Sequence, residues 1–131
     1  MDQIPLVSEE IEGGAKFLEE FDRGFPVAAA VWLKEPDARR WHLYFASATV
    51  TEENRHDARQ EIVRIARKMP ASFFSLSQVN LIMMGHPIAQ RTLAVYQRHS
   101  LPIATVYPVD SFGDLEVEAA YIYPPLKTAA A

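Results

Sequence analysis

The chain of 131 residues has the length of one domain and can bury a sizeable core without disulfides or a metal. Hydrophobic residues make up 49% of it and charged residues 23%, which is typical of globular proteins and excludes a disordered chain. It contains no cysteine, which excludes disulfide bonds, thiolate catalysis and cysteine-ligated zinc sites. The sequence has neither a secretory leader pattern nor an apolar run of about 18 residues, so we expect a soluble cytoplasmic protein without a membrane partner.

The net charge is −4, and it is unevenly distributed along the chain. Residues 1–24 hold seven acidic and two basic side chains, and residues 110–131 hold four acidic side chains and one lysine. The segment between them carries an excess of positive charge. This pattern predicts either charge complementarity within the fold or a face that binds a partner. Because no long basic run occurs, we expect a protein partner rather than nucleic acid.

The first expected helix spans residues 8–24, with Ser8 suited to its N-cap and Gly24 to its end. Its apolar side chains recur on one face: Ile11, Ala15, Phe17, Leu18 and Phe21. The pair Gly13-Gly14 lies inside this pattern, where glycine weakens a helix. The pair therefore predicts either a later helix start or a close approach to another element.

Two strands are expected next, at residues 26–33 and 41–48, joined by a hairpin loop that contains Pro36 and Asp37. The first strand is apolar on both faces, which predicts a central position in the sheet. We expect one face of the pair to carry small side chains that let a helix pack closely: Ala28, Ala30, Ala46 and Ala48.

A helix over residues 51–69 is the clearest pattern in the chain, with Thr51 as its expected N-cap. Its expected buried stripe consists of Ala58, Ile62, Ile65, Ala66 and Met69. Cationic side chains gather in its last turn, where the helix dipole favours them.

The remaining expected elements are a buried strand at 78–84, a helix at 87–99, and strands at 103–107 and 115–123, with a hairpin loop at 108–114. The element order is then α-β-β-α-β-α-β-β. This order predicts an α+β fold with a mixed, largely antiparallel sheet of about five strands and three helices. We expect residues 1–131 to form a single domain, with residues 124–131 as a flexible tail.

An acidic group near the C-terminus is the main catalytic candidate: Asp110, Asp114, Glu116 and Glu118. Glu116 and Glu118 alternate on one expected strand and project from the same face, where paired carboxylates can hold Mg²⁺ for phosphodiester hydrolysis. The pattern resembles nucleases of the PD-(D/E)xK type, but Ala120 stands where that motif has its lysine. Alternatively, the glutamates face water while their neighbours face the core, and we favour this interpretation.

His86 lies in the expected turn between the strand at 78–84 and the helix at 87–99. In that position it can serve as an acid/base or, ahead of Pro87, as a helix cap without catalytic function. We favour the structural role, because the sequence names no partner for this histidine. The spacing of the four histidines does not predict a metal site.

The stretches "GFPVAAAVWL" and "WHLYFASATVTEENRHDARQEI" resemble a group of short, functionally uncharacterised bacterial proteins. The shared features are a Gly-Phe-Pro strand opening, a tryptophan in each hairpin strand and an Ala-Ser exit into a helix. The resemblance extends along most of the chain and implies a bacterial cytoplasmic protein of the same fold. It implies no activity.

The sequence is most consistent with a non-catalytic interaction or regulatory module of unknown function that needs no cofactor. The alternative is a Mg²⁺-dependent phosphoesterase that uses Asp110, Glu116 and Glu118, with His86 as acid/base. We further expect a homodimer, because a small sheet with many aromatic residues tends to leave some of them exposed. These aromatic residues are Trp32, Trp41, Tyr107, Phe112, Tyr121 and Tyr123.

Overall fold

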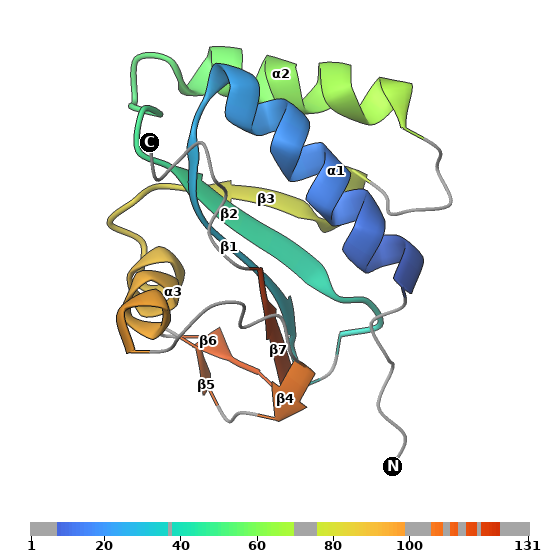
Figure 1. Cartoon of the computed structure of the whole chain (residues 1–131), viewed down its shortest axis with the longest axis vertical. Helices are drawn as coiled ribbons and strands as arrows, with labels where there is room; N and C mark the ends of the chain where they lie inside the picture. Colours follow the sequence, from blue (N-terminus) through green and yellow to red (C-terminus); the bar gives the residue numbers. More distant parts are fainter. Residues whose placement is uncertain are drawn as a thin grey trace.

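The computed structural model describes residues 8–36, 38–69, 76–98, 106–108, 111–112, 115–117 and 119–123. These residues form an α+β fold in which three α-helices pack on a mixed sheet (Figure 1). The expected fold class is confirmed, and residues 124–131, the expected tail, lie outside the described residues. Among the helices described, none is long and apolar enough to cross a membrane.

The elements are α1 (Ser8–Gly24), β1 (Val27–Lys34), β2 (His42–Ser47), α2 (Arg55–Lys68), the 3-10 helix η1 (Leu76–Gln78), β3 (Val79–Ile82), α3 (Pro87–Arg98), β4 (Val106–Pro108), β5 (Ser111–Phe112), β6 (Leu115–Glu116) and β7 (Ala119–Ile122). The main sheet has the strand order β3-β2-β1-β7-β4, and β5 pairs with β6 in a separate two-stranded sheet. β3 runs parallel to β2, while the other three pairs of the main sheet are antiparallel. β1 is central, as its apolar sequence predicts.

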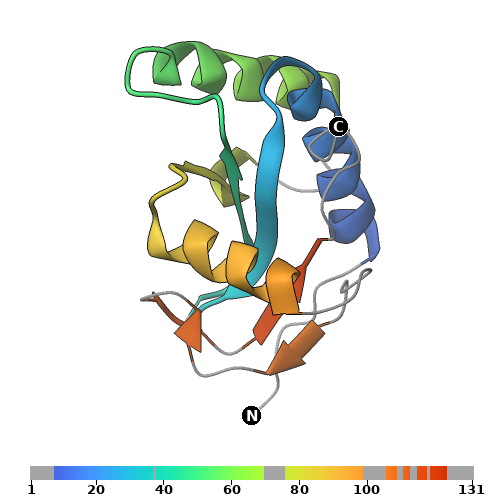
Figure 2. The ribbon, with the colours of Figure 1, turned by 60° about the vertical axis from the view of Figure 1, so that its left-hand side comes forward.

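Helices cover both faces of the sheet. Figure 2 shows α1 and α3 on opposite sides of β1. One buried cluster joins α1 and α2 to the sheet, and in it the rings of Phe17 and Phe21 each pack edge to face with Phe45. A second cluster lies on the α3 side and includes Val31 and Ile122. Because β1 contributes to both clusters, its residues are buried on both faces, which explains its continuous apolar run.

The prediction that four alanines of the first two expected strands share one face of the sheet is wrong. Ala30 pairs with Phe45, whereas Ala46 pairs with Ala29, and paired residues of antiparallel strands project to the same face. Ala30 and Ala46 therefore lie on opposite faces. The register shifts between Val27 and Ala29, so the alternation changes at the start of β1. A bulge of this kind has no signal in an apolar run without glycine.

The expected strand at 115–123 is two strands. β6 ends at Glu116, and β7 begins at Ala119 in the main sheet. Leu115 and Val117 pack in the cluster on the α3 side, whereas Ala119 packs on the side of α1 and α2. The apolar alternation continues across the break because β7 is buried on both faces. The expected loop at 108–114 also contains β5, which forms a hairpin with β6.

β3 is shorter than the expected strand at 78–84, and it is not buried. All four of its residues, Val79–Ile82, are half-buried, because β3 is an edge strand. At the other edge, β4 begins at Val106, and the preceding residues 99–105 lie outside the described part of the chain. α3 begins at Pro87 as expected.

α2 begins at Arg55, four residues after its expected N-cap. Thr51 still organises the helix start, because its N–H donates to Asn54 Oδ1 at 2.7 Å and its Oγ1 accepts from the Asn54 N–H at 3.4 Å. This reciprocal pair has the geometry of a capping box. Ala58, Ile62 and Ile65 of the predicted stripe are buried, whereas Ala66 and Met69 are half-buried.

Candidate functional site

Most of the acidic group that the enzymatic alternative uses lies outside the described residues. Asp110, Asp114 and Glu118 lie outside the described residues. Glu116 is placed in β6 opposite Ser111, but its side chain is not described. Within the described ranges, no group of three or more histidine or acidic side chains is arranged to hold a metal ion.

His86 caps α3. Its Nδ1 accepts a hydrogen bond from the Ile88 N–H at 3.1 Å, and Pro87 occupies the first helical position. The backbone N–H of His86 donates to the Met83 carbonyl at 3.0 Å, which closes the turn after β3. An acceptor at Nδ1 requires the neutral ring with its proton on Nε2. This geometry is the structural role that we favour for His86.

Most of the aromatic side chains expected at a dimer surface are buried: Trp32, Trp41, Phe112 and Tyr123. Tyr121 is half-buried, and the side chain of Tyr107 is not described. Aromatic exposure therefore gives no basis for self-association in the described part of the chain. The explanation is that the sheet is covered on both faces by helices, so that its aromatic residues fill two cores.

A polar chain formed by Trp32 and Tyr123 links the sheet to α1. Trp32 Nε1 donates to Tyr123 Oη at 2.8 Å, and Tyr123 Oη donates to the Ile11 carbonyl at 2.7 Å. A Cβ at Gly14 would lie 2.4 Å from Tyr123 Oη, so α1 can approach only with glycine there. Of the two alternatives for Gly13-Gly14, a later helix start or a close approach to another element, Gly14 therefore shows the close approach. Burial raises the pKa of Tyr123 well above its usual range.

On the opposite face, Tyr96 of α3 inserts its hydroxyl between β1 and the end of β7. Tyr96 Oη donates to the Tyr123 carbonyl at 2.7 Å and accepts from the Ala30 N–H at 3.4 Å. Beside this bridge the two backbones are hydrogen-bonded to each other without an intervening side chain, because the Tyr123 N–H donates to the Ala30 carbonyl at 3.1 Å. Burial raises the pKa of Tyr96 to about 12. Both tyrosines are therefore neutral structural groups at physiological pH.

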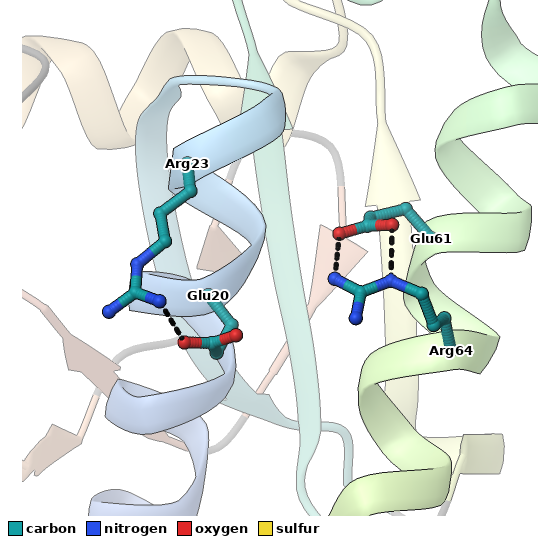
Figure 3. A network of polar contacts seen from close by, with 4 residues as sticks. All are labelled: Glu20, Arg23, Glu61 and Arg64. Carbon is teal, nitrogen blue, oxygen red and sulfur yellow. Dashed lines mark hydrogen bonds and ion pairs between the residues drawn. The ribbon is translucent and has the colours of Figure 1, made fainter.

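Charge complementarity within the fold accounts for part of the uneven charge distribution. α1 contains six acidic and two basic residues, and α2 contains five basic and two acidic residues. The two helices pack against each other, and Figure 3 shows Glu20 with Arg23 on α1 beside Glu61 with Arg64 on α2. The hydrogen bond to Glu61, together with the charges of Glu61 and Glu20, raises the pKa of Arg64. Both pairs are exposed, so they contribute little stability.

The remaining candidate is the edge of the sheet at β3, which is held in place at both ends. At its start, the buried side chain of Gln78 donates to the Trp41 carbonyl at 3.0 Å and to Glu10 Oε2 at 2.8 Å. At its end, the Met84 carbonyl accepts from Gln90 Nε2 at 2.7 Å. β3 is therefore anchored to α1, to the start of β2 and to α3.

Between these anchors the segment is uncharged and, apart from Asn80, apolar. Leu76–Gly85 contains no charged residue and no proline. Val79, Leu81 and Met83 are half-buried against the α1–α2 cluster, and Leu76 is a large hydrophobic residue with 45% of its surface exposed. We refer to Leu76–Met84 as the β3 edge.

The two sheet edges differ in how they are protected. Proteins usually protect an edge strand with lysine, proline, a bulge or a very short strand. Both edge strands are short, with three residues in β4 and four in β3, but β4 ends at Pro108, whereas β3 contains neither lysine nor proline. In the described part of the chain, β3 pairs with β2 alone. The β3 edge is therefore a template for a further strand.

Sequence reasoning did not single out the β3 edge, because an apolar run of this length is equally typical of a central strand. The discriminating signal is the parallel pairing with β2, which a single sequence does not reveal. Comparison of the chain with protein-family models, with curated proteins and with solved structures gave no match.

Proposed function

We propose that the chain is a non-catalytic interaction module that binds an extended strand of a protein partner at the β3 edge. The observation that supports this function is an edge strand that is anchored at both ends, free of charge and flanked by the exposed Leu76. Strand addition uses main-chain hydrogen bonds for affinity and alternate side chains for specificity. We place this activity in the cytoplasm, where a chain without cysteine is at no disadvantage.

Three polar side chains of the described residues that could act as an acid or base are engaged in structural roles. His86 caps α3, and the hydroxyls of Tyr96 and Tyr123 join helices to the sheet. Each of these groups has an assigned partner, whereas the apolar β3 edge has a surface that water solvates poorly. A binding function makes use of that surface, and the alternative phosphoesterase does not.

Selection of ligands from a library of linear peptides displayed on phage tests this proposal. We expect selected peptides to be uncharged, to bind with micromolar dissociation constants, and to lose about tenfold or more in affinity to Leu81→Lys. Leu76→Lys is a second variant, because its exposed position tolerates lysine without loss of folding. Gln60→Lys adds the same charge to the exposed surface of α2 and serves as the matched control.

Two results would contradict the proposed function. The first is a library that, selected against monomeric protein, yields no peptide sensitive to Leu81→Lys or Leu76→Lys. The second is a rise in melting temperature on addition of Mg²⁺ or Mn²⁺ that Glu116→Ala abolishes, since a ligand bound to the native state stabilises it. That outcome would favour the phosphoesterase instead.

A further inference from the structure

We propose that the strand bound at the β3 edge is the β3 edge of a second copy of this chain, paired antiparallel about a two-fold axis at Leu81. This inference rests on the proposed strand-binding function and names its partner. This homodimer uses a different surface from the expected aromatic one, since Trp32, Trp41, Phe112 and Tyr123 are buried. The result is a continuous sheet of ten strands with β4 at each outer edge.

Charge is the first argument for a second copy. A partner strand with a charged side chain would place that charge against half-buried apolar residues, at a cost in desolvation. The β3 edge of another copy is free of charge over the same length. Gln78, which contacts the acidic helix α1, lies three residues from Leu81, so the two copies of Gln78 would be about 20 Å apart. At physiological salt this separation exceeds the Debye length of about 8 Å, which screens repulsion between the two Glu10 carboxylates that Gln78 contacts.

The pleat of the strand restricts the position of the axis. A two-fold axis normal to the sheet pairs two edge strands antiparallel and keeps α1 and α2 of both copies on the same side. Paired residues must then project to the same face, which requires the axis to pass through a residue rather than between two. Leu81 lies midway between Val79 and Met83, and all three side chains pack against the α1–α2 cluster, so an axis at Leu81 superposes apolar positions of the same face.

An axis at Leu81 brings apolar side chains together. Leu81 faces its own copy, and Val79 faces Met83, all on the face that packs against the α1–α2 cluster. The two cores then extend toward each other across the new strand pair. The exposed Leu76 lies in η1, just before β3, so a second copy bound along β3 would lie beside its apolar surface.

Light scattering during size-exclusion chromatography measures the association directly. We expect a mass of twice 14.8 kDa at high micromolar concentration. Leu81→Lys and Leu76→Lys should shift the protein to the monomer, while Gln60→Lys should remain dimeric. Far-UV circular dichroism of each variant confirms that it is folded, so that loss of the dimer reports on the interface.

Disulfide formation tests the register, because the chain has no cysteine of its own. Directly paired residues of antiparallel strands have Cα atoms about 4.5–5.5 Å apart, within the range of a disulfide. Leu81→Cys should therefore form a covalent dimer under mild oxidation, and Gln60→Cys should not. Val79→Cys should cross-link when it is mixed with Met83→Cys, but not by itself.

The outcomes separate this inference from the proposed function. A monomer at high micromolar concentration that still binds peptides at the β3 edge overturns the second copy as partner and leaves the strand-binding function standing. A monomer that binds no peptide overturns both. A dimer that is insensitive to Leu81→Lys and gives no cross-link at Leu81→Cys overturns this interface.

Discussion

Gly14 is the residue that lets α1 approach the sheet. A Cβ at this position would lie 2.4 Å from Tyr123 Oη and 3.2 Å from the ring of Trp32. The hydroxyl cannot move aside without breaking its hydrogen bonds to Trp32 and to the Ile11 carbonyl. The close packing of α1 therefore depends on the absence of one methyl group, which is why a helix of 17 residues tolerates a glycine in its interior.

We expect Gly14→Ala to lower the free energy of unfolding by about 1–3 kcal/mol, as overpacking of a buried site does. Alanine also has a higher helix propensity than glycine, by about 1 kcal/mol, and this gain offsets part of the loss that overpacking causes. Gly85→Ala is the matched control, since a Cβ there meets no atom within 4 Å and its φ lies outside the left-handed region. Urea unfolding of both variants measures the effect. Equal urea midpoints for Gly14→Ala and Gly85→Ala would contradict the requirement for glycine at position 14.

His86 offers a second prediction, for the start of α3. His86→Ala removes the acceptor of the Ile88 N–H, and loss of such a cap costs about 0.5–2 kcal/mol. His86→Asn keeps a side-chain acceptor that favours the N-cap, and we expect it to retain most of the stability. Thermal unfolding of the two variants distinguishes them. Equal losses in both would show that the imidazole ring itself is needed.

Among the elements, those that depend on local patterns were predictable from the sequence. The stripe of Ala58, Ile62 and Ile65 indicates α2 because a helix brings these positions to one face. Pro87 marks the start of α3, since its missing N–H and fixed φ suit the first helical position. The hairpin of β1 and β2 follows from a polar loop between two apolar runs.

The features that depend on contacts between distant elements were not predictable from one sequence. The break between Glu116 and Ala119 moves the chain from one buried cluster to the other, but the alternating apolar residues continue through it. The edge position of β3 depends on its parallel pairing with β2, and an apolar run is compatible with either a central or an edge strand. The β3 edge was therefore missed, although its lack of charge was visible.

At the scale of the whole molecule, Tyr123 connects the two faces of the sheet. Its carbonyl accepts from Tyr96 of α3, and its hydroxyl joins Trp32 of β1 to the Ile11 carbonyl of α1. A single residue after β7 therefore ties both helical layers to the central strand. Groups of this kind make the stability of the protein depend on pH where they ionise, because the fold requires their neutral forms.

We expect the protein to lose stability in the alkaline range because of these tyrosines. Burial raises the pKa of Tyr96 to about 12 in the folded state, whereas a tyrosine of the unfolded chain titrates near 10. The stabilisation is thus fully present below about pH 10 and is lost as the pH rises from there through about 12. Each buried tyrosine contributes a slope of at most about 1.4 kcal/mol for each pH unit in that window.

Tyr96→Phe isolates the contribution of this hydroxyl. At neutral pH we expect the variant to be less stable by about 1 kcal/mol, because the Ala30 N–H and the Tyr123 carbonyl lose their bridging partner. Above pH 10 the free energy of unfolding of the variant should fall less steeply with pH than that of the parent protein. The two slopes should differ by at most about 1.4 kcal/mol for each pH unit, which is the contribution of one ionising group. Urea unfolding at a series of pH values from 8 to about 11.5 gives both quantities, with tyrosinate absorbance as an independent measure of ionisation. Parallel curves for the two proteins across this range would mean that Tyr96 ionises in the folded state as readily as in the unfolded chain, and its bridging role would then be wrong.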